Sequence, residues 1–339
     1  MNLAANANAA LYASMIVYTL AMLAFTWHLA ARAPTVADSK AVAEVAANER
    51  EDVLVGSGAP TPTERRPATP GAGAKRRNAA GPGFEESLKS RQRGSIALML
   101  TYLASALLVA SVLMRGLAVG RPPWGNMFEF ATAAAAAVGA TYSVLAKRNN
   151  WQWLGVFIVT PILLVLGLAL TVLYTEAGEL MPALKSYWLG IHVTVAFLAV
   201  AFFTLAFAVG LLYLVRLRRE EKPPAKPTFI ESLPSSASLE RTAYSLNMVA
   251  FILWTFTLIA GAIWAKQAWG AYWQWDPKEV WTFVIWTVYA AYMHSRATAG
   301  VDHRKSMYIA LAGYVAVIIN FTLVNLVSTF VGMHNYSGM

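Results

Sequence analysis

The chain has 339 residues and a formal net charge of +9; 57% of its residues are hydrophobic and only 13% are charged. Soluble domains carry about 25% charged residues, so this chain has too few polar groups to cover a water-facing exterior. It contains no cysteine, which excludes disulfides, thiolate metal sites, iron–sulfur clusters and a cysteine nucleophile. Any thiol chemistry must therefore take place on a partner. The basic residues lie between apolar runs, which favours a membrane face over nucleic acid as their partner.

A helix needs about 20 apolar residues to cross the hydrocarbon core of a bilayer. Eight runs without Lys, Arg, Asp or Glu reach or approach this length. They cover residues 11–31, 95–114, 130–146, 151–175, 186–215, 242–265, 280–295 and 306–339. The sequence therefore predicts an all-α, polytopic membrane protein with about eight transmembrane helices.

The first run ends in AARA at residues 30–33, which resembles a signal-peptide cleavage site. A cleaved signal needs basic residues before its apolar stretch, and no Lys or Arg precedes Arg32. We therefore interpret residues 1–31 as an uncleaved first transmembrane helix. With the N-terminus outside, the inner segments hold 22 of the 27 Lys and Arg residues, which predicts an N-out, C-out topology.

Two segments between the runs are rich in Pro, Ala and charged residues. Residues 32–93 cannot bury enough apolar surface to offset their ordering entropy, so we predict a disordered cytoplasmic linker there. A second linker, RLRREEKPPAKPTFIESLPSSAS, joins the fifth and sixth runs. Residues 94–339 then form a seven-helix domain.

Six of the 12 tryptophans fall within residues 264–286, WAKQAWGAYWQWDPKEVWTFVIW, in a connection that the topology places outside. An aromatic belt at the membrane surface accounts for one or two tryptophans at a helix end. It does not account for six in one connection, alternating with Gly, Asp, Pro, Lys and Glu. We interpret the segment as a flat, polarizable surface for a large planar ligand.

The topology places four of the five histidines at defined depths. His192 and His334 lie near the outer ends of their spans, on the side of the tryptophan-rich segment. His28 and His294 lie near the inner ends. A single intramembrane histidine can be a hydrogen-bonded structural residue, but one pair on each side indicates axial ligation of haem iron at two sites in series. His303, in a basic inner loop, is interpreted as a solvated residue.

The sequence WGAYWQWDPKEVW, at residues 269–281, resembles the WWD signature of the haem-handling proteins of cytochrome c maturation. The similarity extends through YAAYMHSR at 289–296 and GMHNYSG at 332–338. RPPWGNMFEF is similar to the Pro-x-x-Asn-x-x-Glu loop of that superfamily, which places Asn126 and Glu129 outside. With eight spans and four histidines so arranged, the chain is most similar to the CcsA/ResC family of system II cytochrome c biogenesis, named CcsB in some bacteria.

This resemblance implies a component of a holocytochrome c synthase (cytochrome c haem lyase) complex that carries haem b. Haem would pass from an inner site, with His28 and His294 as axial ligands of the iron, to an outer site ligated by His192 and His334. The outer site would also use residues of the WWD segment, namely Trp269, Trp273, Trp275 and Asp276. There the two thiols of an apocytochrome c CxxCH motif would add across the haem vinyl groups. Because the substrate supplies the thiols, no catalytic residue is expected from this chain.

The resemblance also implies partners, which are a membrane subunit of the CcsB/ResB type, apocytochrome c and a thiol-reducing thioredoxin-like protein. Some residues of the WWD segment have two interpretations. Asp276 and Glu279 can contact the ligand or cap the helix that Pro277 begins. Lys266 and Lys278 can meet haem propionates or solvated lipid headgroups.

Two other classes of function compete with haem handling. A solute or lipid permease would use the tryptophans as an outer gate and the histidines as a proton relay. It predicts internal repeats, and none is visible in the sequence. A structural scaffold of a respiratory assembly would leave the tryptophan spacing unexplained.

Overall fold

The computed structural model describes residues 3–32, 88–176, 178, 186–224, 226 and 228–326. Within these ranges there is no strand, and helices make up most of the chain, which confirms the predicted all-α class. The helices are α1 (Leu3–Arg32), α3 (Leu88–Ala118), α4 (Met127–Asn149), η1 (Gln152–Leu154), α5 (Gly155–Thr171), α6 (Tyr187–Glu221), η3 (Phe229–Ser232), α7 (Ser236–Trp269), α8 (Pro277–Ala297), α9 (His303–Phe321) and α10 (Leu323–Leu326).

The long helices have the length and composition of membrane spans. Because a helix rises about 1.5 Å per residue, about 20 residues cross the hydrocarbon core. Among the described residues, seven helical segments are long and apolar enough to do so. The remaining long helix, α8, has 21 residues but carries tryptophan, tyrosine and threonine where aliphatic residues would raise its hydropathy. The chain is therefore a multi-pass α-helical membrane protein.

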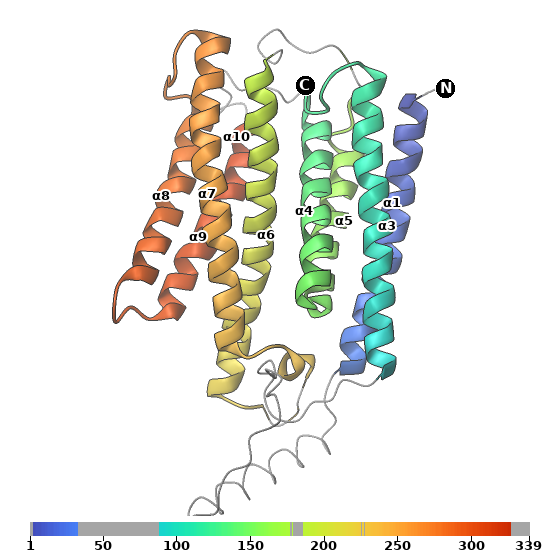
Figure 1. Ribbon diagram of the computed structural model, residues 1–339, viewed down its shortest axis with the longest axis vertical. Helices are drawn as coiled ribbons and strands as arrows, with labels where there is room; N and C mark the ends of the chain where they lie inside the picture. The colour runs from blue at the N-terminus through green and yellow to red at the C-terminus, as the bar shows by residue number, and fades with distance from the viewer. Residues whose placement is uncertain are drawn as a thin grey trace, which may run out of the picture.

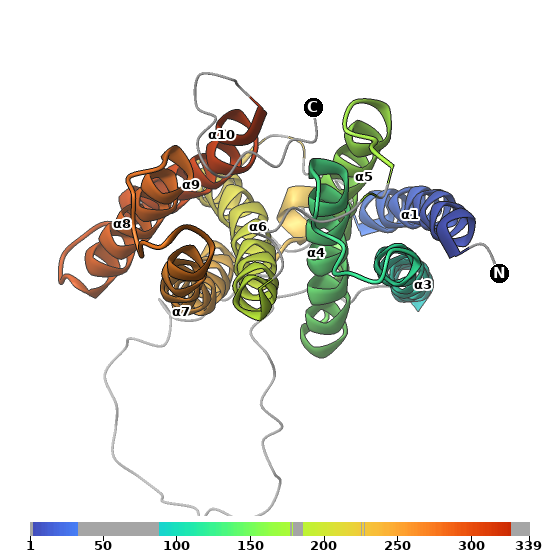
Figure 2. The same cartoon turned by 90° about the horizontal axis from the view of Figure 1, so that it is seen from above.

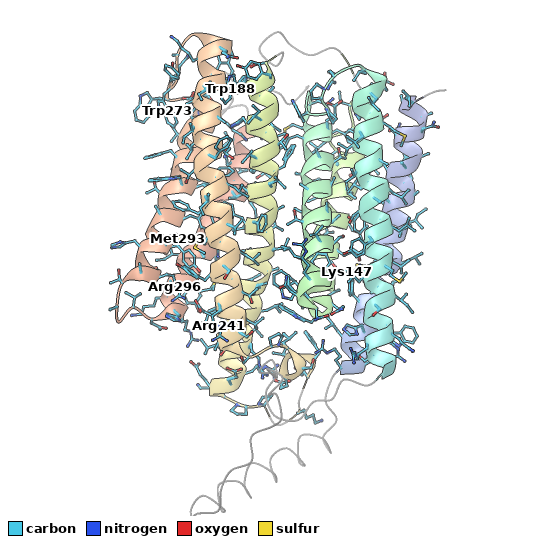
Figure 3. All side chains as sticks on the ribbon, viewed as in Figure 1. Lys147, Trp188, Arg241, Trp273, Met293 and Arg296 are labelled. Atoms are coloured by element: carbon cyan, nitrogen blue, oxygen red, sulfur yellow. The ribbon has the colours of Figure 1, made fainter. Side chains whose placement is uncertain are left out.

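Successive long helices run in alternating directions, as Figure 1 shows. Seen from above, α1, α3, α4 and α5 lie on one side of the bundle, and α6 to α10 lie on the other (Figure 2). The two groups meet where α4 packs against α6. Trp188 and Trp273 lie at one end of the bundle, and Lys147, Arg241 and Arg296 lie toward the other (Figure 3). We call the end that carries Trp273 the tryptophan end.

The structure corrects the ends of several predicted spans. The helix α6 continues to Glu221 and α7 begins at Ser236, so both extend beyond their apolar runs into charged sequence. The helix α3 begins at Leu88, inside the segment 32–93 that was predicted to be disordered. Residues 33–87 lie outside the described part of the chain, and the disorder predicted there stays a prediction.

Aromatic packing joins the helices that carry the tryptophan end. Phe203 of α6 lies flat against Tyr289 of α8, with ring centroids 3.8 Å apart. The edge of Trp254 of α7 meets the same phenylalanine at 6.2 Å. All three side chains are almost fully buried. Packing of this kind gives α6, α7 and α8 fixed relative positions, which a ligand site between them requires.

Candidate functional site

A cavity opens between the helices at the tryptophan end. It contains about 1060 Å³ of space that no protein atom fills, part of it open to the outside. It is lined by Trp124, Asn126, Met127, Phe130, Leu189, His192, Val193, Ala196, Trp254, Thr257, Leu258, Gly261, Ala262, Trp264, Ala265, Tyr272, Trp273, Lys278, Glu279, Thr282, Asn320, Phe321 and Asn325. We call it the aromatic cavity.

The walls of the aromatic cavity are mainly aromatic and aliphatic. Trp254 and Trp264 of α7 are 2% exposed, and the indole Nε1 of Trp254 donates to the Thr282 carbonyl of α8 at 3.1 Å. Phe130 of α4 stacks on Phe321 of α9 with centroids 5.3 Å apart, and Trp254 meets the same Phe321 edge-to-face at 6.5 Å. A flat apolar ligand of considerable size suits such a lining.

His192 of α6 is the one histidine among the described residues that line the aromatic cavity. Its Nδ1 lies 2.9 Å from the backbone carbonyl oxygen of Thr257. A carbonyl can only accept, so Nδ1 carries the proton and donates; in a neutral imidazole the lone pair is then on Nε2. Histidines that bind metals are oriented in this way, with one ring nitrogen donating to a carbonyl. The ring also stacks on Trp264, with centroids 6.0 Å apart and 19° between the planes.

Gly261 gives the His192 ring its space. A Cβ atom built on Gly261 would lie 2.7 Å from Cε1 of His192 and 2.9 Å from its Nδ1, closer than side chains approach one another. Gly261 lies four residues after Thr257, so the carbonyl that orients the ring and the glycine that admits it are one helical turn apart on α7.

A Gly261→Ala substitution is expected to displace the His192 ring and break its hydrogen bond to Thr257. Overpacking of this kind costs about 1–3 kcal/mol. If the cavity holds the haem expected from the sequence, the absorption spectrum of that haem should change, because the orientation of an imidazole ligand influences the iron. Absorption spectra of the purified variant, with and without added imidazole, measure this. The control is Gly167→Ala, since nothing lies within 4 Å of a Cβ at that helical glycine; equal spectra for both variants would contradict the role of Gly261.

The WWD connection is fixed by helix caps at both ends. The helix α7 ends at Trp269, and its C-cap Gly270 adopts the left-handed conformation with φ of 83°; the Nζ of Lys266 donates to the Gly270 carbonyl at 2.7 Å. Asp276 caps the N-terminus of α8, and Glu279 completes a capping box, so both acidic side chains bind backbone N–H groups. The structure thus shows the capping interpretation of Asp276; its contact with haem stays a prediction.

The predicted tryptophans do not all face the cavity. Trp273 lines it and is packed edge-on against Trp275, with centroids 5.8 Å apart. Trp275 is 75% exposed, adopts φ of 59° and does not line the cavity. Trp269 packs its edge on Trp264, with centroids 4.7 Å apart, so it supports a cavity wall from behind. Haem contacts of Trp269 and Trp275 remain predictions.

His28 lies four residues before the end of α1 and is 1% exposed; in Figure 1 this end of α1 lies away from the tryptophan end. Its Nδ1 is 2.9 Å from the Ser90 carbonyl of α3, and a Cβ on Gly94 would lie 2.9 Å from its Cε1. The carbonyl and the glycine are again four residues apart, as around His192. The surroundings of His28 therefore orient its ring in the same manner.

The structure does not bring His28 and His294 together. The helices α1 and α8 that carry them lie at opposite edges of the bundle in both views (Figures 1 and 2). His28 is buried between α1 and α3, whereas His294 is exposed. Ligation of one iron by both would require a second chain or another arrangement of the helices, and the inner haem site stays a prediction. His334 lies outside the described residues.

An ion cluster anchors the loop before α4; it involves Asn126, the N-cap of α4, and Glu129 in the first turn of α4, both noted in the sequence. Asn126 caps α4 by accepting from the Glu129 backbone N–H at 2.9 Å. The Glu129 carboxylate, 0% exposed, pairs with Arg115 at 3.0 Å and with Arg121 at 2.7 Å. Trp124, which lines the cavity, is part of this loop. The ion pairs of the buried Glu129 carboxylate therefore fix the position of Trp124.

Several lining residues were not predicted from the sequence. Asn320 had a visible signal, because it is a polar residue within the last apolar run. The sequence contains no such signal for three residues of α7, Trp254, Thr257 and Gly261, beyond their position in an apolar run. Which face of α7 meets the cavity depends on how α6 packs against α7. Lys278 was considered, and the structure places it in the lining.

The chain is similar to proteins of cytochrome c assembly. A family model described as Cytochrome C assembly protein matches residues 124–332. Three relatives carry the name Cytochrome c biogenesis protein CcsA. The one from a Synechococcus strain is 30% identical over 274 residues, 74% of this chain and 89% of the relative. Those from Guillardia theta and Prochlorococcus marinus are 32% and 31% identical, covering 70% and 71% of this chain and 83% and 84% of the relatives. The family match includes every residue that lines the aromatic cavity.

Proposed function

The chain belongs to the cytochrome c assembly protein family and acts in cytochrome c biogenesis, and from this premise we propose that its aromatic cavity holds haem b for attachment to apocytochrome c. The observation that carries the proposal is the position of His192. It lies in the lining of the aromatic cavity and is oriented through Nδ1, so that Nε2 is the nitrogen that would ligate iron.

The cavity supplies what a porphyrin requires besides an axial ligand. The flat ring of haem is apolar, and the buried indoles of Trp254 and Trp264 offer it polarizable surfaces. Trp273, in the connection between α7 and α8, lines the cavity from the end of the bundle. His334 is proposed as the second axial ligand, and it follows α10 by eight residues in the sequence.

The reaction is the addition of a thiol to a vinyl group. The sulfur of each CxxCH cysteine bonds to the vinyl carbon next to the ring, and the thiol hydrogen is transferred to the terminal carbon, so no external oxidant or reductant enters the balance. This chain contributes orientation, because a held vinyl group meets an incoming thiol at high effective concentration. Having no cysteine of its own, the chain cannot compete for the vinyl groups.

We propose that the working unit is a complex in the bacterial plasma membrane, with the WWD connection on the extracytoplasmic side. The complex would include a membrane subunit of the CcsB/ResB type and the apocytochrome, and a thioredoxin-like protein would keep the CxxCH thiols reduced. The placement of Trp273 at one end of the bundle, opposite Lys147 and Arg241, supports this orientation (Figure 3).

The test uses two porphyrins with the purified complex. Haem b carries vinyl groups, and mesohaem carries ethyl groups in their place. Both are expected to bind and to give a Soret band that changes in the His334→Ala variant. Only haem b is expected to become covalently attached to an apocytochrome CxxCH peptide, measured by mass spectrometry. If neither porphyrin binds the wild-type complex, the proposal is wrong, and a colourless protein would fit a permease.

A further inference from the structure

The aromatic cavity contains one polar corner. Lys278, Thr282, Asn320 and Asn325 gather there, from α8, α9 and α10, in a lining that is otherwise mainly apolar. Lys278 is the only lysine or arginine among the described residues that line the cavity. Burying polar groups is costly unless they are paired, so these residues indicate that a polar part of the ligand is received at this corner.

The ammonium group of Lys278 is held by neutral acceptors. Its Nζ donates to the Asn320 carbonyl at 2.8 Å and to Oδ1 of Asn325 at 3.1 Å, and it lies 4.7 Å from the centre of the Phe321 ring. Within the described residues, no carboxylate lies within 4.0 Å of Nζ. An ammonium group has three N–H donors, so these two bonds leave one for a ligand.

The two acidic residues nearest in sequence are engaged elsewhere. Asp276 accepts from the backbone N–H of Lys278 at 3.1 Å as the cap of α8. Glu279 accepts from the backbone N–H groups of Gln274 at 2.8 Å and Asp276 at 3.2 Å. These contacts fix the first turn of α8, and they direct the carboxylates to the backbone rather than to the Lys278 ammonium.

Asn320 adds a second polar group to this corner. Its side chain is 1% exposed, and its Nδ2 donates to Oγ1 of Thr282 at 3.2 Å. Its Oδ1 is buried without a hydrogen-bond partner among the described residues. The corner therefore offers a cation together with an amide oxygen that can accept a hydrogen bond from a bridging water.

We propose that Lys278 binds a carboxylate of the cavity's ligand, which is a haem propionate if the proposed function holds. Haem has two propionates on one edge of an otherwise apolar ring, which matches one basic corner in an aromatic cavity. His192 approaches from α6 and Lys278 from α8, so the iron and the carboxylate are held by different walls. Lys278 thereby sets which edge of the ring faces α8, and so where the vinyl groups lie.

The test compares two ligands and three variants by spectral titration of the full-length protein in detergent. The ligands are ferric haem and its dimethyl ester, in which both propionates are uncharged. Hydrogen bonds to charged groups contribute about 1.5–3 kcal/mol, so Lys278→Met is expected to weaken binding of the diacid by about tenfold or more. It should leave binding of the ester unchanged, and Lys278→Arg should retain most of the affinity for the diacid.

The matched control is Lys147→Met, because Lys147 is an exposed lysine that lies toward the end of the bundle opposite Trp273 (Figure 3) and does not line the cavity. It should bind both ligands as the wild type does. Equal weakening of diacid and ester by Lys278→Met, or no weakening of either, would overturn the inference. Failure of both ligands to bind the wild type would instead refute the proposed function, so the two failures are distinguishable. Ester binding also shows that the variant is folded.

Discussion

Replacing His192 by alanine is expected to lower the haem affinity of the protein at least tenfold and to stop cytochrome c maturation. Loss of a residue that merely orients a metal ligand costs about 10–100-fold in affinity, and this change removes the ligand itself. Haem content per protein and covalent cytochrome c in the membrane fraction measure the two effects. Added imidazole should restore part of both, since it can occupy the vacated space beside Thr257 and Gly261.

The control for this substitution is His303→Ala. His303 is 55% exposed, lies 3.8 Å from Glu240 and does not line the cavity. It should retain normal haem content and cytochrome c. A His192→Ala protein with unchanged spectrum and maturation would show that the aromatic cavity is not the haem site.

Replacing Glu129 by alanine is expected to destabilise the protein by about 3–5 kcal/mol, the usual cost of removing one partner of a buried ion pair. The substitution strands the Arg115 and Arg121 guanidinium groups, whose side chains are 9% and 8% exposed, without their shared carboxylate. It also removes the acceptor of the Gly125 backbone N–H, at 2.8 Å. Reversible unfolding in mixed detergent micelles measures the loss of free energy.

The comparison for this prediction is Glu221→Ala, which removes the partner of Arg304 in an exposed pair at 3.2 Å. Exposed pairs contribute at most about 1 kcal/mol, so this variant should unfold almost as the wild type does. Equal stabilities for the two variants would show that the Glu129 cluster does not hold the loop. The Glu129→Ala protein should also bind haem more weakly, because Trp124 of the cavity lining lies in that loop.

Most of the fold was predictable because the bilayer imposes a length on each helix. The apolar runs at 95–114 and 186–215 predicted α3 and α6; α3 extends beyond both ends of its run, whereas α6 begins where predicted and extends only beyond the second end. Arg and Glu are good helix formers, so α6 continues through RLRREE after its apolar residues end. Hydropathy locates the portion of a helix within the membrane and contains no information on where the helix stops outside it.

The site was predictable in depth but not in lateral position. Alternation of spans places Trp273 and His192 at one end and His28 and His294 at the other. In the structure, Trp273 and His192 line one cavity at the tryptophan end, whereas His28 and His294 lie near the C-terminal ends of α1 and α8, which end toward the other side. Topology does not say which helices are neighbours. The histidines of the predicted inner pair consequently share a depth while α1 and α8 stand at opposite edges of the bundle (Figure 2). The Thr257 carbonyl that orients His192 could not be predicted either. Every residue has a backbone carbonyl, so the residue types do not show which one accepts a hydrogen bond.

The repeated pairing of a carbonyl with a glycine four positions later has a consequence for how this chain tolerates mutation. Around His28 the pair is Ser90 and Gly94, and around His192 it is Thr257 and Gly261. Each imidazole occupies volume that any larger residue on the adjoining helix would claim. Positions 94 and 261 are therefore constrained by the histidine that packs against each of them. We expect evolution to replace either glycine by alanine only after that histidine has been replaced by a smaller residue.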